Sequence, residues 1–156
     1  MDLYDFFNTF VTAAAGDIEL QTWGQLQFGA AVRIFADVES DGLPTAADMP
    51  YVLFHSPLGS KRQTGRLNSY GLAADLALTK DALKMRLEDN LAEPAGLELI
   101  LDMVTLLVEA LVEALPENVT LAIDLGADTL GMLPEVHAYL DLTFEETITI
   151  GVDPMA

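Results

Sequence analysis

AGLELILDMVTLLVEALVEAL, residues 95–115, is the stretch that decides the fold. Its polar residues recur every three or four positions, as a helical stripe does: Glu98, Asp102, Thr105, Glu109 and Glu113. All other positions from 97 to 115 are apolar, so the apolar arc is wider than an ordinary surface helix needs. The spacing predicts one long helix that packs on a sheet and touches a second apolar surface.

The segments around this helix have the alternating pattern of half-buried strands. The predicted strands are 28–38, 50–56, 69–79, 118–125 and 135–150. In the last of these, alternation places Asp141 and Glu145 on the outer face and the following residues on the inner face: Val136, Ala138, Leu140, Leu142 and Phe144. Residues 2–15 bring Phe6, Phe7 and Phe10 to one face of a predicted N-terminal helix, whose aromatic side chains we assign to the core. The order predicts an α+β fold: a mostly antiparallel sheet packed by one long helix and the N-terminal helix, in a single domain over residues 1–156.

Two segments lack strand alternation. Residues 57–68, PLGSKRQTGRLN, combine glycine, proline and basic residues, and predict a long, mobile hairpin loop. Residues 80–91 predict a short helix with Thr79 as its N-cap.

Composition limits the class of protein. The chain has 156 residues, of which 51% are hydrophobic and 21% charged, and it has no cysteine. Such a chain folds without disulfides and has no thiolate metal site. No basic segment opens the sequence, and four acids interrupt the most apolar stretch, so we expect a soluble, unexported, cytoplasmic protein with no membrane contact.

The charge is strongly negative and unevenly placed. The net charge is −18, six of the seven basic residues fall between Lys61 and Arg86, and residues 87–156 hold fifteen acids and no Lys or Arg. We expect no tight nucleic-acid binding, because that needs clustered positive charge. The split suits like subunits that meet head to tail, with Lys61, Arg62 and Arg66 as interface residues. The alternative is solubility charge with a chance basic cluster.

One acidic segment matches part of a calcium-loop pattern. Its candidate ligands are Asp37, Glu39, Asp41 and Asp48, with Gly42 at the sharp turn. Pro44 breaks the pattern, and the predicted flanks are strands instead of helices. An acidic turn is therefore the preferred interpretation, and we predict no metal and no cofactor.

No catalytic motif is present, and the two histidines, His55 and His137, are interpreted as hydrogen-bonded structural residues. We therefore predict that the chain is not an enzyme.

The sequence of elements from Trp23 to Gly151 resembles the tail terminator and tail-completion proteins of long-tailed phages. The resemblance rests on the strand FGAAVRIFADV, the strand at 50–54, the polar loop at 57–68, SYGLAADLAL, the long helix at 96–115, and the closing strands NVTLAIDL and HAYLDLTFEETITIG.

The resemblance implies a homo-oligomer, a hexameric ring that caps the tail tube. Its partners would be the tail-tube and head-connector proteins. It would be cytoplasmic during assembly and part of the virion tail afterwards. The resemblance also implies that acids such as Asp141 and Glu145 line a lumen through which DNA passes. The alternative is a small acidic binding protein, either a nucleic-acid mimic or an inhibitor of a basic partner.

Overall fold

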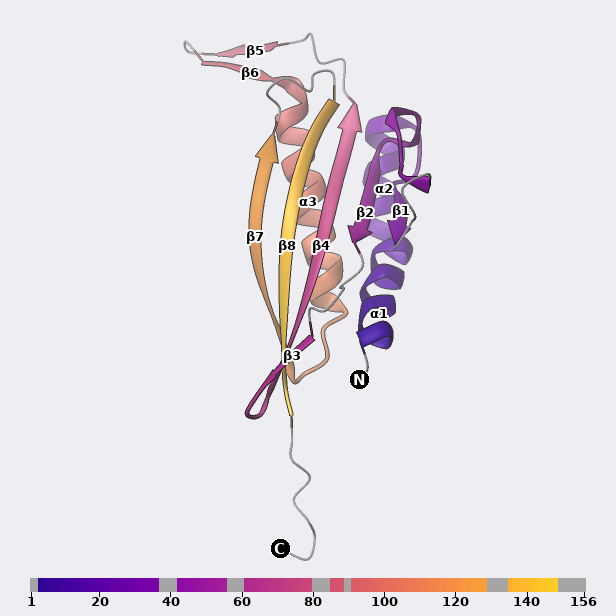
Figure 1. The fold of residues 1–156 in the computed structure, drawn as a ribbon. Coiled ribbons are helices and arrows are strands. Elements are labelled where there is room, and N and C mark those ends of the chain that lie inside the picture. The colour runs from indigo at the N-terminus through magenta and orange to yellow at the C-terminus, as the bar shows by residue number, and fades with distance from the viewer. Residues whose placement is uncertain are drawn as a thin grey trace, which may run out of the picture.

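The computed structural model describes residues 3–36, 42–55, 61–79, 85–88, 91–128 and 135–148. The protein has an α+β fold, as predicted, in which a mostly antiparallel sheet is packed by a long helix (Figure 1). The helices are α1 (Leu3–Gly16), α2 (Ile18–Phe28) and α3 (Ala95–Glu113), with a 3-10 turn, η2 (Ala46–Asp48). The strands are β1 (Arg33–Ala36), β2 (Tyr51–His55), β3 (Lys61–Thr64), β4 (Leu67–Thr79), β5 (Met85–Glu88), β6 (Leu91–Pro94), β7 (Val119–Asp128) and β8 (Glu135–Thr147).

The main sheet has the strand order β1-β2-β4-β8-β7, and β3 pairs with β4 beside β2. All of its pairs are antiparallel except β1 with β2. Helix α3 packs across β4 and β8, and α1 and α2 pack on the same side next to it. The strands β5 and β6 form a separate two-stranded ribbon.

The core lies between the helices and one face of the sheet. Alternate residues of β8 are buried there, as predicted: Val136, Ala138, Leu140, Leu142 and Phe144. On the helix side, Phe6 and Phe10 are buried, which confirms their assignment to the core. The ring of Phe6 stacks on Tyr70 with a centroid distance of 4.1 Å, and the ring of Phe10 stacks on Phe144 at 4.4 Å.

The strand predicted from Phe28 is wrong over its first residues, because Phe28 ends α2. This helix begins at Asp17, whose carboxylate accepts a hydrogen bond from the Leu20 N–H at 2.9 Å, and it ends at Gly29 in the left-handed conformation. Only two residues of α2, Leu20 and Gly24, are buried, so the segment lacks the wide apolar stripe that reveals a helix.

The other two departures are in segments with polar sequences. The predicted loop at 57–68 contains β3, and β4 already begins at Leu67, because Gly65 (φ +59°) permits a tight turn between them. The predicted helix at 80–91 is wrong where the structure describes it, since residues 85–88 are strand β5 and β6 begins at Leu91. Both hairpins are held by backbone pairing, which a polar sequence does not reveal.

Candidate functional site

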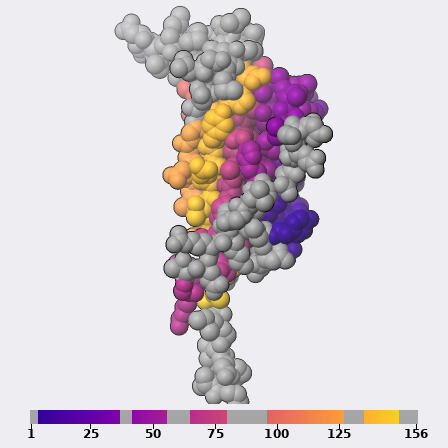
Figure 2. Space-filling model, viewed as in Figure 1, coloured from indigo at the N-terminus to yellow at the C-terminus, as the bar shows by residue number. Residues whose placement is uncertain are grey.

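The second face of the sheet is not covered by the helices. In Figure 1 these lie behind the strands, and in Figure 2, which has the same view, atoms of β4, β7 and β8 reach the surface. We call this side the open face. Its exposed residues on β7 and β8 are mostly polar or acidic: Thr120, Asp124, Tyr139, Asp141, Thr143 and Glu145. The prediction that Asp141 and Glu145 face away from the core is therefore confirmed.

Two acids of the open face are direct neighbours. Asp124 of β7 and Asp141 of β8 are cross-strand partners, and both are exposed. Like charges directly opposite each other destabilise a sheet. This cross-strand pair therefore does not contribute to the stability of the sheet.

The open face also has an apolar corner and a histidine–carboxylate pair. Tyr51 and Leu53 are buried with Phe35 next to them, and His55 beyond them contacts the Asp75 carboxylate. Burial raises the pKa of the Tyr51 phenol above its ordinary value of 10.0, and the nearby charges of Glu135 and Asp75 raise the pKa further.

The second histidine is also paired. His137 is only 9% exposed, and its Nε2 lies 3.1 Å from the carboxylate of Glu135. Both histidines are thus held by a carboxylate, as the structural interpretation predicts. Within the described ranges, no group of three or more His, Asp or Glu side chains is placed to hold a metal ion.

The calcium-loop candidates are not brought together in any described site. Asp37, Glu39 and Asp41 lie outside the described residues. Asp48 accepts hydrogen bonds from the Thr45 backbone N–H at 2.9 Å and from the Arg33 guanidinium at 2.8 Å. These two contacts, the first being stronger, hold the pKa of Asp48 below its ordinary value of 3.8. Asp48 thus has a local structural role.

A different feature, which sequence reasoning missed, lies at the edge of the sheet. Helix α3 packs over β4 and β8, and along the adjacent strand β7 the burial falls from Val119, which is buried, to Ile123 and Leu125, which are exposed. Four apolar side chains along this side are therefore exposed, by 37% to 50%: Leu101, Val112, Ile123 and Leu125. We call these four residues the open flank. Alternation predicted a half-buried strand with Ile123 and Leu125 on one face, but it gave no information on how far the helix covers that face.

Strand β7 is also an edge strand, because β8 is its only partner in the sheet that the structure describes. Its outer side therefore carries backbone N–H and C=O groups that no other strand of the described sheet pairs. Its sequence, VTLAIDLGAD, has none of the lysines or prolines that block edge pairing. The open flank and this edge together form a surface suited to another polypeptide.

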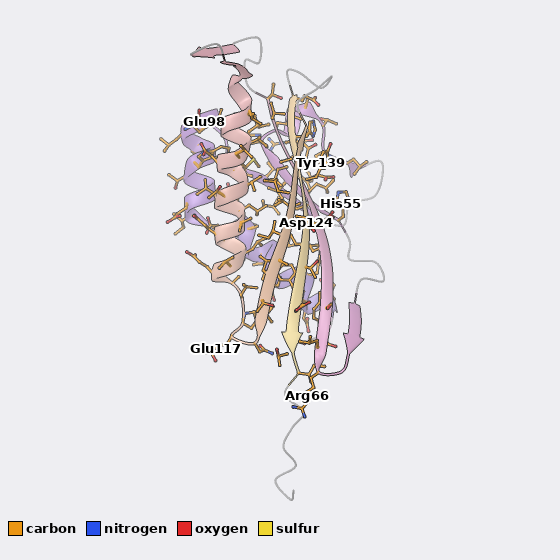
Figure 3. All side chains as sticks on the ribbon, turned by 90° about the vertical axis from the view of Figure 1, so that its left-hand side faces the viewer. His55, Arg66, Glu98, Glu117, Asp124 and Tyr139 are labelled. Atoms are coloured by element: carbon orange, nitrogen blue, oxygen red, sulfur yellow. The ribbon has the colours of Figure 1, made fainter. Side chains whose placement is uncertain are left out.

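The predicted interface residues lie on the β3–β4 hairpin. Lys61 and Arg62 are positions on β3, paired with Tyr70 and Ser69 of β4. Arg66 is exposed in the turn and makes no ion pair with any described residue; Figure 3 shows it at the lower end of the molecule. The hairpin therefore places three basic residues of the sequence at one end of the sheet.

No helix within the described part of the chain is both long and apolar enough to cross a membrane. No protein-family model and no curated protein matches the sequence.

Proposed function

We propose that the protein is a structural subunit that assembles into a ring, and that it acts in phage tail assembly as a terminator or completion protein that caps the tail tube. The observation that carries this proposal is the open flank beside the unpaired edge of β7. Apolar side chains next to free backbone groups favour association with another chain. The ring and its position in the virion are inferred from the resemblance of the element order to tail terminator and completion proteins.

The acids of the open face support the same role. A ring through which DNA passes needs a lumen that does not hold the phosphate backbone. The exposed carboxylates of Asp124, Asp141 and Glu145 would repel DNA if this face lined the lumen. The cross-strand pair of Asp124 and Asp141, unfavourable for folding, then has a function in the assembly.

The test of this function is the mass in solution, with and without tail-tube and head-connector proteins. We expect a species close to six times the 16.9 kDa chain mass, either alone at high concentration or on the end of isolated tail tubes. Electron microscopy of capped tubes identifies the position. A chain that stays single at all concentrations and does not bind tail tubes contradicts the proposal.

The second candidate is an acidic protein that binds a basic partner, and the clustered acids of the open face favour it. In that case the chain would remain monomeric or dimeric, and its binding to a cationic protein would weaken steeply as salt is added. The mass measurement therefore separates the two functions.

A further inference from the structure

We infer how neighbouring copies contact each other: the basic β3–β4 hairpin of one copy docks on the open flank and the acidic stripe of α3 in the next copy. This inference rests on the proposed ring, and it specifies the surface and the partner, a second copy of this chain.

The acceptor side combines apolar surface with negative charge. Asp102, Glu109 and Glu113 are exposed on α3, next to Leu101 and Val112 of the open flank. None of these three acids makes an ion pair with any described residue. A partner that covers the open flank would therefore bury apolar area and meet unpaired carboxylates at its border, as in a typical interface with a polar rim.

The donor side has the opposite charge. The hairpin from Lys61 to Arg66 has three basic residues, Lys61, Arg62 and Arg66, and no acid. No other strand of the described sheet pairs with the second edge of β3, and this is the edge that would pair with the edge of β7 in the next copy. Charge complementarity and strand addition thus favour the same contact.

The edges of β3 and β7 cannot pair within one copy, because the strands β4 and β8 separate β3 from β7 in the sheet. Figure 3 shows Arg66 at the lower end of the molecule and Glu98, near the start of α3, at the upper end. A contact between two different surfaces is heterologous, so its repetition gives a ring when the rotation closes.

The test uses two variants with opposite charge. The first replaces Lys61, Arg62 and Arg66 with Glu, and the second replaces Asp102, Glu109 and Glu113 with Lys. In each variant alone, like charges face each other across the contact, and we expect association to weaken at least about tenfold. Mixed in equal amounts, the two variants present opposite charges at every contact. We expect them to form rings of alternating copies, which native mass spectrometry identifies from their masses.

The matched control replaces Thr12, Glu19, Thr22, Gln25 and Gln27 with Lys. All five residues are exposed on α1 or α2 and outside the proposed contact, and the change in net charge, +6, equals that of the second variant. We expect this control to assemble like the wild type. Circular dichroism and thermal unfolding verify that each variant is folded.

The outcomes separate the inference from the proposed function. Wild-type rings that persist in both charge-reversed variants overturn the contact but leave the ring-forming function in place. Two variants that fail alone and also fail when mixed overturn the contact as well, provided that both are folded. A wild-type chain that never associates, even on tail tubes, overturns both.

Discussion

Glu146 lies on the helix-covered face of β8, where its neighbours Leu142 and Phe144 are buried. One of its oxygens accepts hydrogen bonds from the Asn68 amide and the Tyr70 hydroxyl, both at 3.1 Å. These bonds join the first residues of β4 to the end of β8. The carbonyl oxygen of the Asn68 side chain is buried without a hydrogen-bond partner, so the amide already carries a cost of burial.

Replacing Glu146 by Leu removes the acceptor that Asn68 and Tyr70 share. We expect the free energy of unfolding to fall by about 1–3 kcal/mol, the cost of leaving buried donors unpaired. The matched control is Glu145→Leu, the same change at the next residue, which is exposed on the open face. Its effect should stay within about 0.5 kcal/mol. Urea unfolding of the two variants measures both values, and equal losses would contradict this role of Glu146.

Tyr51 permits a prediction about pH. Its pKa is raised in the folded state above the ordinary 10.0, chiefly by burial. The resulting contribution to stability is therefore present below pH 10 and is lost as the pH rises through the folded pKa. We expect the Tyr51→Phe variant to lose less stability than the wild type above pH 10. In spectroscopic titration of phenolate, one of the tyrosines that ionise above pH 10 should be missing from the variant.

At the scale of elements, the β3–β4 hairpin depends on its turn. Gly65 has φ +59°, and an added Cβ would meet nothing within 4 Å. The cost of Gly65→Ala therefore comes from backbone strain alone, about 1 kcal/mol. We expect amide hydrogen exchange in residues 61–64 to become about fivefold faster.

Gly126 of β7 is the matched control for Gly65. An added Cβ there also meets nothing within 4 Å, but its backbone is not in the left-handed region. Gly126→Ala should be neutral or stabilise β7 by about 0.5–1 kcal/mol. Equal effects at both positions would mean that the turn does not require glycine.

The hydrophobic pattern of the sequence predicted those elements best that pack a large part of their surface on the core. Helix α3 and the strand β8 bury long periodic faces, so their first residues were predicted correctly, while α3 ends two residues and β8 three residues before the predicted ends. Helix α2 is defined by a cap at each end and by Gln21, whose side chain bonds the Val32 N–H at 2.8 Å and the Val32 carbonyl at 2.9 Å. Caps and contacts between distant residues leave no periodic spacing of apolar residues in the sequence, so α2 could not be predicted from hydrophobic periodicity.

At the scale of the whole molecule, a net charge of −18 destabilises the compact state through self-repulsion. Added salt screens this repulsion, so we expect Tm to rise by about 2–4 °C between low and physiological ionic strength. The double variant Asp124→Asn/Asp141→Asn should have a higher Tm at low salt and a smaller rise. Differential scanning calorimetry over a salt series measures both, and a Tm independent of salt would contradict the expectation.

The candidate surface was predicted only in part. The basic residues Lys61, Arg62 and Arg66 stood out from charge alone, and alternation correctly turned Asp141 away from the core. The open flank was not predicted, because Leu101 and Ile123 have the same chemistry as core residues. Their exposure depends on which strands α3 covers.

The sequence by itself determined the α+β class, the long helix, the buried face of the central strands and the uneven charge, because each depends on periodicity or composition within a segment. The tertiary structure alone decided the strand order, the position of β7 at an edge, the separation of β3 from β7 and the exposure of the open flank. These features arise from contacts between residues far apart in the chain. The residue pattern within one segment does not determine which other segments pack against it.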